Sequence, residues 1–254
     1  MTALRALVRP PGDSFARAIS ARVPRPVIDV ALARRQHAAY CAALRRTGVE
    51  LIELPPDEAH PDACFVQDMA VIYRDLAVVA RPGAESRRGE EEAVRQALTG
   101  HKRLAEIRAP ATLEGGDVLV LGTRLFVGLS ARTNHGGFAQ LRDLLELEGA
   151  TVKALEVPEG LHLLSGCTYL GLGMLLVSET YADLPAFAAL QKVRVPPEEA
   201  PAANALGLGH HVVLPAGYPR TAGRIRGRGF EVLTVDLSEF AKADGGATCL
   251  SLIF

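Results

Sequence analysis

The C-terminal segment contains a cysteine, Cys249, that follows two glycines and opens an apolar run. The segment reads Asp-Gly-Gly-Ala-Thr-Cys-Leu-Ser-Leu-Ile-Phe over residues 244–254. A thiol becomes a strong nucleophile when it loses its proton, and glycine allows tight turns and the close approach of another group. The segment therefore predicts a presented nucleophile. The alternative is a buried cysteine on a terminal core strand, because a free thiol also behaves as a small hydrophobic group.

Acidic side chains stand beside apolar, strand-like runs at two other places. Residues 62–68 read Asp-Ala-Cys-Phe-Val-Gln-Asp, and residues 113–117 read Leu-Glu-Gly-Gly-Asp and lead into the apolar run 118–121. Burying a carboxylate is costly unless it is paired. We therefore interpret these acids either as parts of a site or as solvated groups at an edge strand and a hairpin turn.

A histidine and two arginine-bearing loops complete the candidate groups. His162 stands in Leu-His-Leu-Leu-Ser-Gly, where a hydrogen-bonded core histidine is the alternative to a functional one. Arg87 lies in the loop 81–89, and Arg132 lies in the loop 130–134. Each loop follows an apolar run and precedes a helical stretch, where functional loops commonly lie.

Together these groups indicate one kind of chemistry. A thiol, a histidine and carboxylates can perform nucleophilic attack followed by proton transfer. Carboxylates beside a thiol raise its pKa and suppress the thiolate, so the site makes sense if the substrate supplies the positive charge. A guanidinium is permanently charged, planar and matched to carboxylates in bidentate geometry. Since the arginines would hold an anionic end of the same molecule, the substrate is predicted to be an arginine-like amino acid.

The elements that must position these groups alternate between apolar runs and helical stretches, which is typical of an α/β protein. Five helices are predicted, one per roughly fifty residues, so we expect a five-fold architecture. No linker stands out, and residues 1–254 are expected to form a single domain. The predicted helices are 30–46, 87–98, 136–147, 184–191 and a fifth that opens at Pro219 and ends near 227–229; the predicted strands are 51–54, 70–73, 76–80, 118–121, 125–127, 174–177, 212–214 and 232–235.

Composition argues against several classes of partner. The 254 residues are 48% hydrophobic and 22% charged, which is ordinary for a globular protein. A net charge of -1 gives no electrostatic reason to expect nucleic acid or an anionic membrane, and no apolar run reaches the ~20 residues of a membrane span. The adjacent His210 and His211 would point to opposite faces of a strand, so we do not interpret them as a metal pair.

The four cysteines indicate a compartment. They are widely scattered and form no C-x-x-C motif, which argues against a disulfide framework or a thiolate metal site. The first nine residues lack the pattern of a signal peptide. We therefore expect a reducing, cytoplasmic location. The cysteines are Cys41, Cys64, Cys167 and Cys249.

On these residues the chain resembles the dimethylarginine dimethylaminohydrolases of the guanidino-group-modifying, or pentein, superfamily. The resemblance implies a five-bladed α/β propeller of ββαβ units around a central site, in agreement with the five predicted helices. Arginine deiminases of the same superfamily carry a sizeable helical insertion for which this chain has no room. The matching stretches are 61–68, 81–88, 112–117, 128–134, 161–163, 202–204 and 244–249.

The resemblance also implies a role for each matched residue. Cys249 would be the nucleophile, His162 the general acid and then base, and Glu114 the group that orients His162. Asp68 would grip the guanidinium nitrogens. The remaining implied substrate contacts are Phe65 along the aliphatic stem, Arg87 and Arg132 at the α-carboxylate, Asp62 at the α-ammonium, and backbone carbonyls near Ile19 and Ala243.

The implied activity is hydrolysis of Nω-methylated arginines (asymmetric dimethylarginine and monomethylarginine) to citrulline and dimethylamine or methylamine. The reaction would pass through a covalent thiouronium on Cys249, with no metal or organic cofactor. The implied partner is a small-molecule substrate, and the sequence leaves a homodimer open. The loop 10–26 is predicted to be a lid, because a charged reaction centre benefits from excluding water.

One departure from the family pattern leaves the substrate open. The family usually has Glu-Asp where this chain has Gln67-Asp68, so Gln67 is also an implied substrate contact, and its amide removes one negative charge near the cation. Arginine itself or another substituted guanidino compound therefore remains an alternative substrate for a hydrolase or deiminase. Outside enzymes, the alternative is a non-catalytic binding protein on the same propeller.

Overall fold

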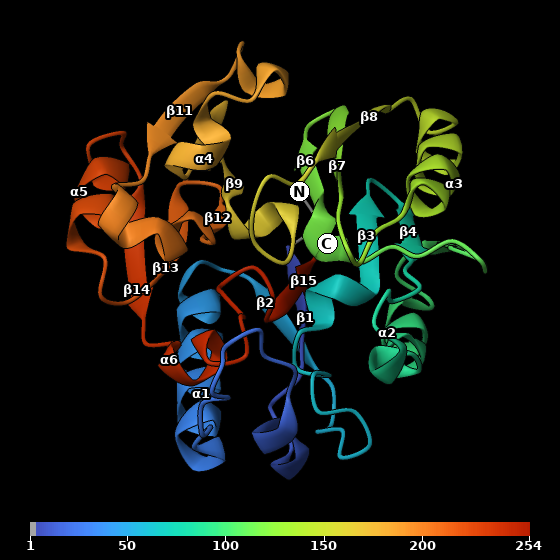
Figure 1. Cartoon of the computed structure of the whole chain (residues 1–254), viewed down its shortest axis with the longest axis horizontal. Helices are drawn as coiled ribbons and strands as arrows, with labels where there is room; N and C mark the ends of the chain where they lie inside the picture. Colours follow the sequence, from blue (N-terminus) through green and yellow to red (C-terminus); the bar gives the residue numbers. More distant parts are fainter. Residues whose placement is uncertain (1–3) are drawn as a thin grey trace.

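The computed structural model describes residues 4–254. Residues 1–3, part of the segment considered above for a signal-peptide pattern, lie outside that range. Five three-stranded sheets surround a common centre, as Figure 1 shows. The sheets are β15 (Ser251–Ile253), β1 (Arg5–Val8) and β2 (Glu50–Glu53); β3 (Ala70–Tyr73), β4 (Leu76–Val79) and β5 (Arg103–Glu106); β6 (Val118–Leu121), β7 (Arg124–Leu129) and β8 (Thr151–Glu156); β9 (Cys167–Gly171), β10 (Met174–Val177) and β11 (Gln191–Arg194); and β12 (Leu206–Leu208), β13 (His211–Pro215) and β14 (Glu231–Val235).

Every sheet repeats the same connection. Its middle strand pairs antiparallel with the inner strand and parallel with the outer strand. A parallel pair needs a crossover connection, and here each crossover contains a helix. The predicted five-bladed α/β propeller of ββαβ units is confirmed. The helices are α1 (Val30–Arg46), α2 (Glu90–Leu98), α3 (His135–Glu146), α4 (Glu179–Ala182), α5 (Pro219–Arg226) and α6 (Ser238–Ala241).

The two ends of the chain build one blade together. β1 pairs antiparallel with β15, in a register that places Ala6 opposite Ile253 and Val8 opposite Ser251. β1 also pairs parallel with β2 through the crossover helix α1. This blade therefore has the same ββαβ order as the others, with its first strand taken from the C-terminus. The pairing brings the segment before β15 to the centre of the propeller.

The longest predicted helix is confirmed residue for residue. The Asp29 side chain accepts a hydrogen bond from the Leu32 amide at 2.9 Å and so caps the first turn of α1. The helix ends at Arg46, and Gly48 follows with φ +84°, a conformation that glycine adopts without steric cost. α5 opens at Pro219 as predicted, since proline at the first helical position loses no hydrogen bond.

The helix predicted over 184–191 is wrong. α4 lies earlier, a 3₁₀ turn covers Pro185–Phe187, and Gln191 already begins β11. Pro185 explains the difference, because proline disfavours the helical conformation of the residue before it. Leu184 accordingly has an extended backbone, with φ -58° and ψ 128°.

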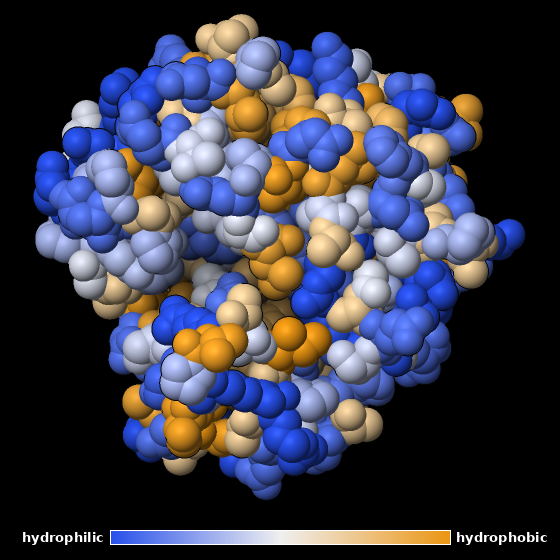
Figure 2. Space-filling model, viewed as in Figure 1, coloured by the Kyte–Doolittle hydropathy of each residue, from blue (hydrophilic) through white to orange (hydrophobic). Residues whose placement is uncertain are grey.

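No helix among residues 4–254 is long and apolar enough to cross a membrane. Figure 2 shows a face covered mainly by hydrophilic residues, with hydrophobic residues in scattered groups.

Candidate active site

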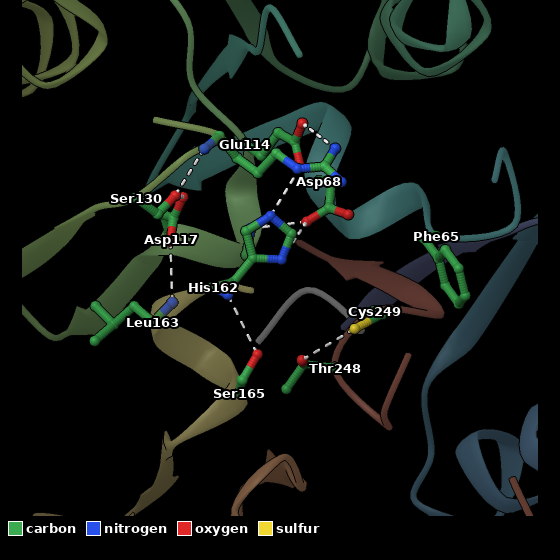
Figure 3. Close-up of polar contacts among 12 residues, drawn as sticks. Phe65, Asp68, Glu114, Asp117, Ser130, His162, Leu163, Ser165, Thr248 and Cys249 are labelled. Atoms are coloured by element: carbon green, nitrogen blue, oxygen red, sulfur yellow. Dashed lines mark hydrogen bonds and ion pairs between the residues drawn. The ribbon is translucent and has the colours of Figure 1, made fainter. Parts of the chain in front are cut away.

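A small pocket lies among loops that precede the inner strands of the blades. Cys249 comes before β15, Asp68 before β3, Glu114 before β6 and His162 before β9. Figure 3 shows how these side chains lie around one site. All the predicted site residues except Glu114 and Gln67 line the pocket, whose volume is about 20 Å³: its walls are Ile19, Asp62, Phe65, Asp68, Arg87, Arg132, Leu161, His162, Ala243, Asp244, Gly245 and Cys249.

Cys249 lies in the turn that leads into β15 and is partly buried. Its sulfur accepts a hydrogen bond from the Gly246 amide at 3.4 Å, and its carbonyl accepts one from the Gln67 amide at 3.3 Å. Burial, and then the charge of Asp68, raise the pKa of the Cys249 thiol above its ordinary value. The thiol is therefore protonated at neutral pH in this arrangement of the site.

His162 and Glu114 form a buried pair. His162 Nε2 lies 2.8 Å from Glu114 Oε2, and the Glu114 side chain is 0% exposed. Burial lowers the pKa of His162, but the charge of Asp68 and the hydrogen bond to Glu114 outweigh it and raise that pKa overall. The Nδ1 atom of the same imidazole lies 3.9 Å from Asp68 Oδ1. A protonated imidazole between two carboxylates can serve as a general acid.

Glu114 is held ionised by its surroundings. Burial alone would raise the pKa of Glu114, but the hydrogen bond from His162 and the charges of Arg87 and Arg132 lower it to about 2. The backbone amide of Gly83 donates to Glu114 Oε1 at 3.1 Å, and Arg132 Nη1 lies 3.4 Å from the same oxygen. Glu114 therefore carries a fixed negative charge that favours the imidazolium form of His162.

Gly116 is at a position where any side chain would clash with its neighbours. A Cβ atom at Gly116 would lie 2.7 Å from both Asp68 Oδ1 and His162 Nδ1. The Gly116 amide also donates to Asp68 Oδ1 at 3.0 Å. The paired glycines in 113–117 therefore allow the backbone to pass directly behind the imidazole and the carboxylate.

Asp117, which the sequence analysis left without a role, holds the loop that carries His162. Its side chain is fully buried and accepts hydrogen bonds from the Leu163 amide at 3.0 Å and from the Ser130 hydroxyl at 2.6 Å, as Figure 3 shows. Burial raises the pKa of Asp117. The sequence could have indicated a role for Asp117, because this residue lies in the same short motif as Glu114.

Arg87 is surrounded by acids. Its Nη1 atom lies 2.7 Å from Asp68 Oδ2 and 3.6 Å from Glu114 Oε2, and its Nη2 atom lies 2.9 Å from Glu90 Oε2. Nη2 also donates to the Phe65 carbonyl at 3.3 Å. Every nitrogen of Arg87 thus has an acceptor within the protein. In this conformation its guanidinium neutralises Asp68.

Glu90 is a second residue that sequence reasoning missed. It opens α2, three residues after Arg87, and is 1% exposed. Burial raises the pKa of Glu90 to about 7, although the charge of Arg87 acts in the opposite direction. The spacing of three residues at a helix start was the only sequence signal for this contact.

Asp62 lies under the N-terminal loop. Its carboxylate accepts hydrogen bonds from the Ile19 amide at 3.0 and 3.3 Å, and burial raises the pKa of Asp62. The next part of the loop is fixed by the Ala21 amide, which donates to Asp244 Oδ2 at 2.6 Å. Val23 is 95% exposed at the outer end of the loop. Residues 18–21 therefore cover the pocket.

Phe65 forms an apolar wall of the pocket. Its ring lies edge-on to Phe15 and Phe240, with centroids 5.9 and 6.3 Å away. A Cβ atom at Gly245 would lie 2.4 Å from the Phe65 ring, so this glycine is required for close packing. Neither Gly245 nor Gly246 has a positive φ, whereas Asp244 does, at 58°.

Gln67 does not line this pocket. Its side chain faces a separate cavity of about 210 Å³, formed mainly by the inner strands of the blades. Gln67 Oε1 is buried there without a hydrogen-bond partner. The replacement of the family's usual glutamate by Gln67 therefore changes the charge of this separate cavity and not that of the pocket. The expectation that Gln67 contacts the substrate cation has no support in the geometry.

Two buried carboxylates and an imidazole lie close together at the pocket. Oxygen and nitrogen atoms of Asp68, Glu114 and His162 lie within 4.8 Å of one another. Asp68 and Glu114 already pair with the guanidinium of Arg87. The cluster thus accepts a planar guanidinium between buried acids, with a thiol in the same pocket.

Comparison with known proteins agrees with this geometry. The family model described as "N,N dimethylarginine dimethylhydrolase, eukaryotic" matches residues 16–186. The protein named N(G),N(G)-dimethylarginine dimethylaminohydrolase from Pseudomonas aeruginosa is 40% identical over 230 residues, which cover 89% of this chain and 90% of that protein. The protein of the same name from Streptomyces coelicolor is 38% identical over 256 residues, which cover 99% of this chain and 97% of that protein.

Solved structures extend the similarity to three dimensions. A cysteine-to-serine variant of the Pseudomonas aeruginosa protein, complexed with citrulline, superposes with a TM-score of 0.96 at 36% identity and covers 98% of both chains. A second dimethylarginine dimethylaminohydrolase structure, a histidine-to-glycine variant as an adduct with S-methyl-L-thiocitrulline, also has a TM-score of 0.96 at 36% identity. It covers 98% of this chain and 99% of that chain. The chain therefore belongs to the dimethylarginine dimethylaminohydrolase family of the pentein superfamily.

Proposed function

We propose that this protein hydrolyses Nω-methylated arginines to citrulline and dimethylamine or methylamine. The observation that carries the proposal is the shared pocket, which contains the Cys249 thiol, the His162 imidazole and the Asp68 carboxylate. Relatives over nearly the whole chain carry the name of this activity. Because residues from Ile19 to Cys249 line the same pocket, we infer that residues 1–254 act as one catalytic domain.

In the first half of the reaction, the thiolate of Cys249 attacks the guanidinium carbon. The substrate cation lowers the pKa of the thiol when it binds, because it stabilises the negative charge on sulfur. The released proton goes to solvent. The imidazolium of His162 then donates its proton to the departing amine, and a cationic thiouronium remains on the sulfur.

In the second half, neutral His162 takes a proton from water, and the hydroxide adds to the thiouronium carbon. Collapse of this intermediate breaks the carbon–sulfur bond and releases citrulline after loss of a proton. Glu114 keeps His162 oriented and favours its charged form in both halves, since the two side chains are 2.8 Å apart. The substrate carbon is already activated by its charge.

Asp68 and the arginines orient the substrate. The Arg87 guanidinium pairs with Asp68 at 2.7 Å. We infer that the substrate guanidinium replaces Arg87 at Asp68, and that Arg87 then turns with Arg132 toward the α-carboxylate. Asp62 and the backbone near Ile19 and Ala243 take the α-ammonium, and Phe65 packs along the aliphatic stem.

The N-terminal loop must move to admit the substrate. A volume of about 20 Å³ is enough for about one water molecule, far less than an amino acid needs. The covering residues are held by few hydrogen bonds, those of the Ile19 and Ala21 amides among them. We infer that residues 18–21 open as part of a lid and close again over the substrate.

We expect citrulline to slow hydrogen exchange in this lid. The Ile19 and Ala21 amides should exchange severalfold more slowly with saturating citrulline, because the filled pocket favours the closed loop. Mass spectrometry of exchanged peptides measures this, with peptides of α1 as the internal control. Unchanged exchange over 18–21 would rule out a lid that responds to the occupied pocket.

A substrate panel tests the proposed specificity. We expect kcat/KM for dimethylarginine and monomethylarginine to exceed that for arginine by about tenfold or more, which corresponds to the roughly 1–3 kcal/mol of discrimination that one methyl-sized group provides in a fitted pocket. Citrulline release from the three compounds is measured under identical conditions. Equal or better turnover of arginine would replace the proposed function with an arginine hydrolase.

The cellular location follows from the thiol. All four cysteines are free, and the proposed nucleophile requires a reduced sulfur. We infer a reducing compartment such as the cytoplasm.

A further inference from the structure

The fifth blade also places a residue at the nucleophile. Four of the loops that precede inner strands carry Asp68, Glu114, His162 and Cys249. The remaining loop, before β12, carries Asn204, directly after the 3₁₀ segment Pro197–Ala203. Asn204 is 8% exposed, and its Nδ2 atom lies 3.8 Å from the Cys249 sulfur.

The orientation of the Asn204 amide is fixed by its other contacts. Asn204 Oδ1 accepts a hydrogen bond from the Thr248 amide at 2.9 Å and another from the Thr248 hydroxyl at 3.0 Å. A backbone amide can only donate, so the oxygen of Asn204 must face Thr248. The NH₂ group therefore faces the sulfur as a donor.

The backbone is shaped to allow this contact. A Cβ atom at Gly246 would lie 2.4 Å from Asn204 Cγ, so any other residue there would displace the amide. The Gly246 amide is itself a donor to the sulfur, at 3.4 Å. The sulfur thus lies between two N–H donors, one from the backbone and one from Asn204.

We propose that Asn204 positions Cys249 for attack and stabilises its thiolate, a role that deepens the proposed hydrolysis and rests on it. The negative charge that forms on sulfur is opposed by Asp68, which lines the same pocket. Hydrogen bonds from neutral donors favour the charged form without adding a competing cation to the substrate site. In agreement, burial and Asp68 raise the pKa of Cys249, whereas the donors Gly246 and Asn204 lower it.

The test measures the thiol directly. The rate at which iodoacetamide alkylates Cys249 is followed against pH by peptide mass spectrometry, for the wild-type protein, Asn204→Ala and Asn204→Asp. The wild-type midpoint should lie above that of an ordinary thiol. Asn204→Ala should move the midpoint further up and slow alkylation at neutral pH by about tenfold, which corresponds to one unit of pKa.

Asn204→Asp separates donation from structure. Its carboxylate can still accept both hydrogen bonds from Thr248, so the loop keeps its shape, but it presents a negative oxygen to the sulfur. We expect a larger upward shift of the midpoint than in Asn204→Ala, and a fall in kcat with little change in KM. Asp29→Ala is the matched control, because it removes the cap of α1 and lowers stability by about 1 kcal/mol without touching the sulfur.

The outcomes are distinct. If folded Asn204→Asp has the same pH midpoint of Cys249 alkylation as the wild-type protein, the proposed role of Asn204 is overturned. This holds for any result with Asn204→Ala. Alkylation needs no guanidino substrate, so the shift can be measured even if the protein hydrolyses none of the substrate panel. In that case the proposed function fails and the effect of Asn204 on the thiol is still decided.

Discussion

Cys249→Ala is expected to lower the rate of citrulline formation by about 10⁴-fold or more, because the variant lacks the atom that forms the covalent intermediate. The fold should persist, since Cys249 as a residue is only partly buried and removing its sulfur leaves a small change in the turn before β15. Steady-state citrulline assays measure the loss, and circular dichroism with thermal melting checks the fold. Substantial turnover by Cys249→Ala would end the covalent mechanism.

Cys41→Ala is the matched control. Cys41 is also a free cysteine beside an imidazole, with its sulfur 3.7 Å from His37 Nδ1. Burial raises the pKa of Cys41 to about 11 and lowers the pKa of His37 to about 4, so this pair stays neutral. We expect Cys41→Ala to melt at a lower temperature and to retain wild-type turnover, because a cysteine–histidine pair that burial keeps uncharged supplies neither a thiolate nor an imidazolium.

His162→Gly is expected to lower kcat by about 10²- to 10⁴-fold, the usual contribution of a general acid–base group. Without the imidazole, the amine must leave without a proton donor and water must attack without a base. A substrate with an alkylthio leaving group avoids the first difficulty, because a thiolate leaves without prior protonation. That substrate should release one equivalent of thiol per protein and then stop, with little citrulline formed.

His211→Ala is the control for this experiment. His211 also pairs with a carboxylate, with its Nε2 atom 3.4 Å from Glu231, but it lies at the start of β13, away from the pocket. Its removal should leave both substrates turning over. Continued citrulline production from the alkylthio substrate by His162→Gly would show that another group activates the water.

The sequence predicted the architecture because most helices begin and end at local signals. Asp29 and Gly48 delimit α1, and Pro219 opens α5. The outer strands β5 and β8 were not predicted, since their exposed polar residues interrupt the apolar pattern. β1 was also missed, because its partner β15 lies at the other end of the chain and no local pattern links the two.

The candidate site was predictable in its residue types but not in its supporting contacts. Motifs with paired glycines marked the loops of Glu114 and Cys249, where the backbone passes close to other side chains. Glu90 and Asn204 act through contacts made only in the folded chain. Gln67 was placed at the substrate with Asp68 because the resemblance aligns the two with an adjacent Glu-Asp pair of the family, yet successive residues in the 3₁₀ segment Val66–Met69 point in different directions. Gln67 therefore faces the separate cavity between the inner strands, and Asp68 faces the pocket.

The most direct measurement of the proposed chemistry is the site of the covalent adduct. His162→Gly is mixed with the alkylthio substrate, quenched with acid, digested and mapped by mass spectrometry. The mechanism predicts that the mass of one amidino-substituted amino acid appears on the peptide that contains Cys249, and on none that contains Cys41, Cys64 or Cys167. An unmodified Cys249 peptide from protein that has released its equivalent of thiol would contradict nucleophilic attack by this sulfur.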